Sequence, residues 1–169
     1  MGKIVDGFRF VPPALRAWLS QDVPSEPFNG YIPWTALRKP VKQLTFSLMT
    51  SAGINIKSDP PFNMEREKRE PTWGDPTCRE IPEYTTERDI DVNHLHINTS
   101  YIKQDINVML PVKRFKEFEE EGIIGRLAPT CYSYYGFQLD AAVLLDTTMP
   151  KVAAKLSEEG VDAVLLTPA

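Results

Sequence analysis

Two helix-and-strand units in the second half of the chain restrict its fold more than any other feature. The first follows Pro111, which begins a predicted helix over 112–121 that leads into a short apolar strand over 123–127. In the second, a helix ended by Gly160 leads into a buried strand over 161–167. Helices that alternate with strands over tight connections predict a parallel sheet covered by helices.

The first half of the chain has a different composition. Most of the 15 prolines lie there, and they predict long ordered loops in place of regular elements. We expect a proline-rich N-terminal arm over 1–42, followed by an α/β domain over 43–169. The predicted fold class is α/β, with a mainly parallel sheet flanked by helices in a three-layer, Rossmann-like arrangement.

The clearest strand of the first half spans 44–50, where residues suited to a pleated surface alternate. The small-residue turn that ends at Gly53 follows, and there the backbone could approach a ligand closely. A long polar loop over 55–78 contains the charge run from Glu65 to Glu70, which is most simply a solvated face.

Charge and cysteine content exclude several classes of protein. The net charge of -4, with basic residues balanced by nearby acids, argues against nucleic-acid binding. We find no apolar run of membrane-spanning length and no secretory signal at the N-terminus. Cys78 and Cys131 are too few for a disulfide framework, so we expect a reduced, cytoplasmic protein in which both thiols are small buried side chains.

His94 and His96 are the two histidines of the chain. On a strand they would point to the same face and could bind zinc with Asp91 or Asp105. Alternatively they are loop histidines that bond to backbone or carboxylate groups, or one of them serves as acid or base in a substrate pocket.

Asp105 and Asn107 lie just before the helix that Pro111 begins, where such residues either brace a turn or contact a ligand. A cluster of aromatic residues surrounds Gly136, and its simplest role is core packing, although tyrosine hydroxyls also line polar pockets. Its members are Tyr132, Tyr134, Tyr135 and Phe137.

Several short segments, taken in order, resemble one known family. They are 51–57, 61–63, 79–82, His94, Ser100, 105–107, 125–129 and 158–168. In order and spacing they resemble the selenoprotein B family of glycine, sarcosine, betaine and D-proline reductases, from about residue 43 to the end of the chain.

The resemblance implies a reaction. In this family the last strand runs directly into a selenocysteine, which a Cys and a helix follow. A partner subunit carries a pyruvoyl group that binds the substrate amine, and a thiol redox carrier is a possible second partner. The selenol attacks the α-carbon, and the C–N bond of the amino acid or amine is reductively cleaved. A selenolate at a strand end and helix N-terminus is stabilised by the helix dipole.

The resemblance also implies a substrate pocket made of Gly53, Asn55, His94, Asp105 and Asn107, with no metal. His94 is the one candidate catalytic side chain in this chain. The last residues, Thr167 and Pro168, would lead into the reactive loop.

We therefore expect a UGA codon, which encodes selenocysteine, directly after Ala169. On this expectation the chain is a truncated reading of a longer selenoprotein, holds no cofactor of its own and is inactive alone. The alternatives are a genuinely short gene that encodes a non-catalytic scaffold or binding paralogue, and a small metal-dependent hydrolase that uses His94 and His96. The chain departs from the family pattern at Asn55, Cys78 and Asn98, so the resemblance does not fix the substrate.

Overall fold

The computed structural model describes residue 13, residues 35–95 and residues 97–169. The chain divides into two compact units, Met1–Ala36 and Leu37–Ala169, and the fold described below is that of the second. Most of the predicted arm over 1–42 lies outside the described residues, so the arm stays a prediction. Among the described residues, no helix has both the length and the apolar character needed to cross a bilayer.

A five-stranded sheet organises the second unit around β1. Its strands are β1 (Thr45–Thr50), β3 (Cys78–Pro82), β5 (Arg126–Leu127), β6 (Thr130–Tyr134) and β7 (Ala163–Thr167). β5, β6 and β7 all pair in parallel with β1, and β7 does so over five residue pairs. β3 pairs antiparallel with β6. The α/β class is thus confirmed, but the sheet is mixed, so the prediction of a mainly parallel sheet holds only in part.

β3 is the exception to the parallel pairing. The segment before β3 is a loop with a short helix, without the long crossover helix that usually joins parallel strands. β3 lies in the sheet as an antiparallel neighbour of β6, with Cys78 opposite Tyr134. A separate two-stranded antiparallel sheet joins β2 (Ile54–Ile56) to β4 (Ile90–Val92).

The helices follow the sequence signals closely in the second half of the chain. α4 (Val112–Glu120) begins after Pro111, and α5 (Met149–Glu158) carries Pro150 in its first turn. The shorter helices are η2 (Val41–Gln43), α2 (Met64–Arg69), α3 (Ser100–Gln104), η3 (Ile106–Val108) and the π-helical turn η4 (Leu144–Thr148). The predicted strand over 123–127 is reduced to the two residues of β5.

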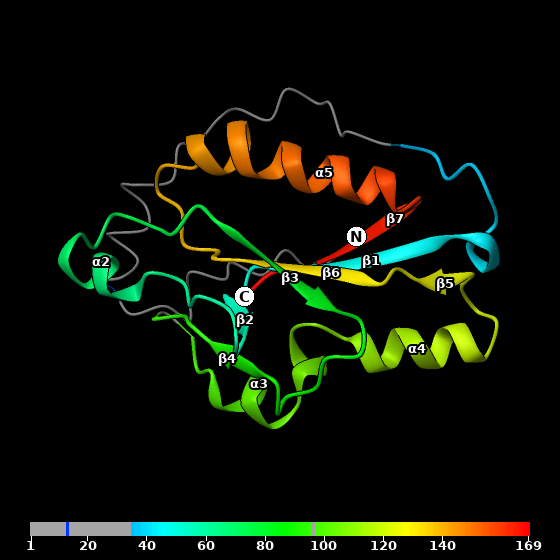
Figure 1. The fold of residues 1–169 in the computed structure, drawn as a ribbon, viewed down its shortest axis with the longest axis horizontal. Helices are drawn as coiled ribbons and strands as arrows, with labels where there is room; N and C mark the ends of the chain where they lie inside the picture. The colour runs from blue at the N-terminus through cyan, green and yellow to red at the C-terminus, as the bar shows by residue number, and fades with distance from the viewer. Residues whose placement is uncertain (1–12, 14–34, 96) are drawn as a thin grey trace. The chain divides into compact units, whose positions relative to one another are not determined.

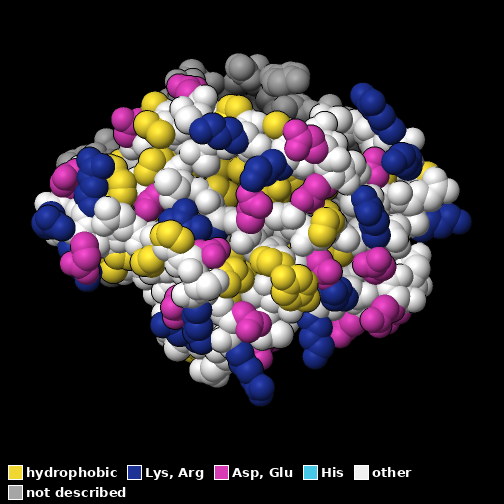
Figure 2. Space-filling model, viewed as in Figure 1, with side chains coloured by type: hydrophobic (Ala, Val, Ile, Leu, Met, Phe, Trp, Pro, Cys, Tyr) yellow, Lys and Arg dark blue, Asp and Glu magenta, His cyan; other side chains and the backbone are white. Residues whose placement is uncertain are grey.

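Side chains alternate across the strands and build a hydrophobic core on each face of the sheet. Leu48 of β1 and Cys131 of β6 pack with Phe115 of α4 on one face. Their neighbours Met49 and Tyr132 pack with Val152 of α5 on the other. The sheet accordingly lies between α5 on one side and α4 with α3 on the other (Figure 1). On the face shown in Figure 2, positive and negative side chains are interspersed, with apolar side chains between them.

Candidate functional site

The carboxyl ends of β1, β6 and β7 meet at one edge of the sheet because the three strands run parallel. Ser51, which directly follows β1, ties these ends together. Its backbone N–H donates to the Thr167 carbonyl at 3.2 Å, and its carbonyl accepts from the Gly136 N–H at 2.9 Å. Its hydroxyl oxygen accepts from the Ala169 N–H at 2.8 Å.

Gly53 allows a second loop to reach this edge. Its φ is 65°, and a Cβ placed there would lie 2.2 Å from the Asn93 carbonyl oxygen. The Asn93 N–H donates to the Gly53 carbonyl at 2.8 Å, and the Gly53 N–H donates to the Tyr134 carbonyl at 3.0 Å. The backbone that approaches this glycine closely is that of the loop that carries His94, and a contact with ligand stays a prediction.

Asn55 of β2 braces the same loop from inside the protein. It is 1% exposed, and its side-chain oxygen accepts from the Asn93 side-chain amide. Its own amide nitrogen donates to the Ile56 carbonyl at 2.8 Å. The amide is thus bonded within the protein, as a buried polar group must be.

His94 lies in the loop after β4, which ends at Val92. His94 is therefore a loop histidine, which is one of the alternatives that the sequence left open, and His96 lies outside the described residues. The His94 ring packs on the Tyr135 ring with 4.7 Å between centroids. The Tyr135 hydroxyl, in turn, donates to a carboxylate oxygen of Glu67 at 2.6 Å.

Glu67 and Tyr135 are the two members of this site that the sequence signals missed. Glu67 belongs to the charge run predicted as a solvated face, yet it is 2% exposed. Tyr135 was assigned to core packing, and it is indeed fully buried, but its hydroxyl is bonded to the carboxylate. Spacing gave no signal for either contact, because α2 has only six residues and its charged side chains are consecutive.

The comparison with protein families decides what this chain is related to. The family model for glycine/sarcosine/betaine reductase selenoprotein B matches residues 26–169. The chain belongs to this family. The resemblance expected from the sequence is therefore confirmed.

Two curated relatives are subunits of reductase complexes. The chain is 36% identical over 134 residues to the D-proline reductase subunit gamma of Acetoanaerobium sticklandii, a match that covers 79% of this chain and 52% of the relative. It is 29% identical over 146 residues to the glycine reductase complex component B subunit gamma of Carboxydothermus hydrogenoformans, covering 86% of this chain and 32% of the relative. The chain thus spans about half or less of the length of these relatives. No solved structure matches it.

In this member of the family, the predicted pocket residues Asp105 and Asn107 are bonded to each other. The Asp105 carboxylate accepts from the Asn107 backbone N–H at 2.9 Å and from its side-chain amide at 2.7 Å. The Asn107 side-chain oxygen accepts from the Lys113 N–H at 2.9 Å. The hydrogen bonds from Asn107 hold the pKa of Asp105 below its usual value. These contacts give both residues the bracing role, at the start of η3 and α4, and a contact with ligand stays a prediction.

Thr167 is the last residue of β7, and Pro168 follows it beside the site. The Thr167 hydroxyl bonds to the carbonyls of Met49 and Met109, which fixes the end of β7 to β1 and to the segment before α4. Pro168 is exposed. The carboxyl end of β7 is therefore held from both sides.

The zinc alternative is not tested by the structure. His96 lies outside the described residues. Within the described part of the chain, no three His, Cys, Asp or Glu side chains are grouped as metal ligands. A site that uses His94 and His96 stays a prediction.

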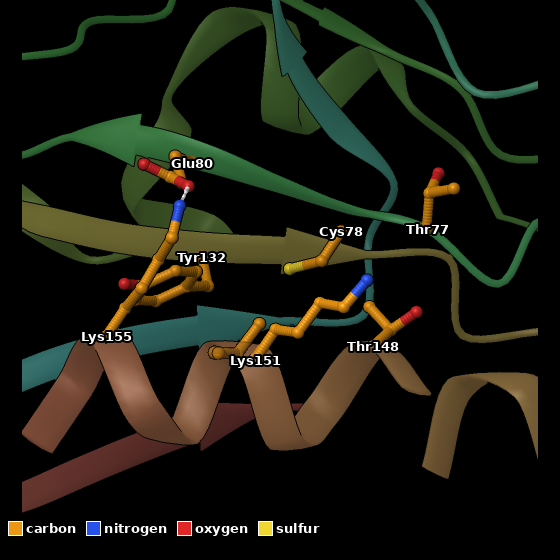
Figure 3. Close-up of a pocket in the computed structure, with 8 residues that line it drawn as sticks. Thr77, Cys78, Glu80, Tyr132, Thr148, Lys151 and Lys155 are labelled. Carbon is orange, nitrogen blue, oxygen red and sulfur yellow. Dashed lines mark hydrogen bonds and ion pairs between the residues drawn. The ribbon is translucent and has the colours of Figure 1, made fainter. Parts of the chain in front are cut away.

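A separate cavity of about 250 Å³ lies between α5 and strands β3 and β6. Cys78, Tyr132 and Lys151 line it, and Lys155 of α5 reaches across to Glu80 of β3 (Figure 3). Burial raises the pKa of the Cys78 thiol to about 11.

The second thiol, Cys131, is fully buried in the other core, on the α4 face. Burial raises its pKa to about 12. Because a thiolate is the nucleophilic form of cysteine, neither Cys78 nor Cys131 is activated at neutral pH.

Proposed function

We propose that this chain is part of a selenocysteine-dependent, cytoplasmic reductase that reductively cleaves the C–N bond of an amino acid or amine. Its family membership supports the reaction class. The observation that carries the proposal is the convergence of β1, β6 and β7 at Ser51, which holds the carboxyl end of β7 in a fixed position. We propose that the selenol nucleophile belongs in the segment directly beyond β7.

The residues at this edge suit such a nucleophile. The N–H groups of Ser51 and Gly136 are used to join strand ends, so the turn that would carry the nucleophile starts from a rigid support. A selenol there would supply the attack on the α-carbon, and a thiol reductant would restore it. A pyruvoyl group on a partner subunit would hold the substrate amine.

This chain's own residues supply the rest of the proposed site. Asn55, Asn93 and Gly53 fix the loop that carries His94. When the C–N bond breaks, its electron pair stays on nitrogen, which then needs a proton. His94 is the side chain to which we assign that proton transfer, since imidazole exchanges protons near neutral pH.

The second candidate function is a non-catalytic scaffold or binding paralogue. It is favoured by the position of the two thiols: Cys131 is buried in the core, and burial raises the pKa of both Cys78 and Cys131, so neither is activated as a nucleophile. On either reading we expect the 169-residue chain alone to lack reductase activity.

The coding sequence separates the two candidates. The reductase proposal predicts an in-frame UGA codon after the Ala169 codon, followed by a readable frame with a Cys codon two or three positions later. A conventional stop codon with no readable frame beyond it would favour the scaffold.

Reconstitution then tests the reaction. The full-length selenoprotein with its pyruvoyl partner and a dithiol should reduce at least one of glycine, sarcosine, betaine or D-proline, and replacing the selenocysteine by Ser should abolish turnover. If the complex assembles and reduces none of them, the proposed substrates are wrong. Stoichiometric zinc that is lost from a His94→Ala/His96→Ala variant would instead support the hydrolase alternative.

A further inference from the structure

The carboxylate of Glu67 is buried and is connected to His94 through Tyr135. Glu67 is the one buried residue of α2. Its neighbours on α2 are exposed and pair among themselves: Glu65 with Lys68 at 2.6 Å, and Arg66 with Glu70 at 3.0 Å. Because burying a carboxylate is costly unless it is bonded, the inward position of Glu67 requires a specific partner.

Tyr135 is such a partner, and it connects Glu67 to His94. It is fully buried, and its hydroxyl donates to Glu67 at 2.6 Å. Burial, and then the hydrogen bond to Glu67, raise the pKa of Tyr135 above its usual value. The phenol is therefore protonated at neutral pH and offers its O–H to the carboxylate.

Tyr135 also contacts His94 through its ring. The two ring centroids are 4.7 Å apart, and the ring planes are inclined at 51°. Aromatic faces carry negative potential and attract cations, including a protonated imidazole. A phenol whose O–H is donated to a carboxylate has more electron density in its ring, so the Glu67 bond strengthens this attraction.

We propose that Glu67 and Tyr135 are positioning residues that hold the His94 ring and favour its protonated form. That His94 then gives this proton to the departing nitrogen rests on the proposed function. In that step the C–N bond breaks with its electron pair going to nitrogen, an N–H bond of His94 breaks, and a new N–H bond forms on the leaving amine. The selenolate forms a bond to carbon as the C–N bond breaks. A dithiol reductant would then release the product: the C–Se bond breaks, carbon takes a proton, the selenol is restored and the two thiols are oxidised to a disulfide.

The two residues that we connect to His94 come from different elements. Tyr135 follows β6, and Glu67 comes from α2. Glu65, also from α2, lines a shallow surface pocket with Asn93, and it is exposed and paired with Lys68. Glu65 therefore provides a matched control: it carries the same charge on the same helix, without the bond to Tyr135.

The test is a histidine titration by NMR on the 169-residue chain, which has two histidines to resolve. Glu67→Gln keeps an acceptor for the Tyr135 hydroxyl but removes the charge. It should lower the titration midpoint of His94 by about half a pH unit, the size expected for a weakened cation–aromatic contact. Glu65→Gln should leave that midpoint unchanged. Equal midpoints in wild type and Glu67→Gln would overturn the proposal.

A wild-type measurement covers the case in which Glu67→Gln does not fold. His94 should titrate at higher pH in the folded chain than in the same chain unfolded in urea, and its ring protons should be shifted upfield by the Tyr135 ring. A lower midpoint in the folded chain would contradict the proposal. Neither measurement uses reductase activity, so a negative result leaves the proposed reductase standing, and a failed reconstitution leaves the Glu67–Tyr135–His94 assignment intact.

Discussion

At the scale of single residues, Gly53 shows how the site depends on one missing side chain. The left-handed φ of 65° alone favours glycine, and the Asn93 carbonyl occupies the place of a Cβ at 2.2 Å. Gly122, which follows α4, has a similar φ of 69° but no atom within 4 Å of its Cβ position. A side chain at Gly122 would therefore meet only the strain of the left-handed backbone, whereas a side chain at Gly53 would meet that strain and also a clash with Asn93.

We predict that Gly122→Ala lowers the free energy of unfolding by about 1 kcal/mol, the cost of a left-handed residue with a side chain. Gly53→Ala should lower the free energy of unfolding by about 1–3 kcal/mol more than Gly122→Ala does, because the loop that contains Asn93 must also move away. Urea unfolding of both variants measures the difference. Equal losses would show that the Asn93 loop gives way freely and does not hold His94 rigidly.

At the scale of elements, Asp162 joins the start of β7 to β1. Its carboxylate accepts from the Thr45 N–H at 3.0 Å and pairs with Lys39 at 2.9 Å. The hydrogen bond from Lys39, followed by that from Thr45, lowers the pKa of Asp162 from its ordinary value of 3.8. A carboxyl group whose pKa is lowered by folding stabilises the folded state above its unfolded pKa.

The stabilisation by Asp162 should therefore be complete above pH 3.8 and be lost as the pH falls through the lower, folded-state pKa. We predict that Asp162→Asn has a lower free energy of unfolding than wild type at pH 7. The difference in free energy of unfolding between the two should become smaller below pH 3.8. Urea midpoints measured across this range give the comparison. Asp146→Asn, at an exposed position of η4, is the control and should follow wild type at every pH. If the difference in urea midpoint between Asp162→Asn and wild type stayed constant with pH, the proposed link between the ionisation of Asp162 and stability would be contradicted.

At the scale of the whole molecule, the sheet is buried unevenly. β1 lies at its centre, and Leu48 is fully buried in the core on the α4 face. β7 pairs with β1 along one side, and no strand among the described residues pairs with its other side. Leu166 on β7 is 65% exposed. Stability should accordingly depend on β1 far more than on the outer side chains of β7.

Leu48→Ala should lower the free energy of unfolding by about 2–5 kcal/mol, since it leaves a cavity in a packed core. Leu166→Ala removes the same atoms from an exposed site and should change the free energy of unfolding by less than about 0.5 kcal/mol. Denaturant unfolding of the 169-residue chain compares the two. A large loss in Leu166→Ala would mean that this side chain is covered in solution.

The sequence by itself determined the elements whose signals are local. Pro111 and Gly122 bracket α4, Pro150 and Gly160 bracket α5, and alternation marks β1. These signals depend on residues close together in the sequence, within one or two helical turns, so they do not depend on the rest of the fold. The order of short segments along the chain also sufficed to identify the family.

Only the tertiary structure decided the direction of β3, the burial of Glu67 and the contact between His94 and Tyr135. Each depends on residues far apart in the chain: 68 positions separate Glu67 from the tyrosine to which it is bonded. Whether a carboxylate in a charge run faces water or a phenol is set by what packs against its helix, and no local pattern encodes that. The strand ends that meet at Ser51 are brought together for the same reason, because parallel pairing joins segments that the sequence keeps apart.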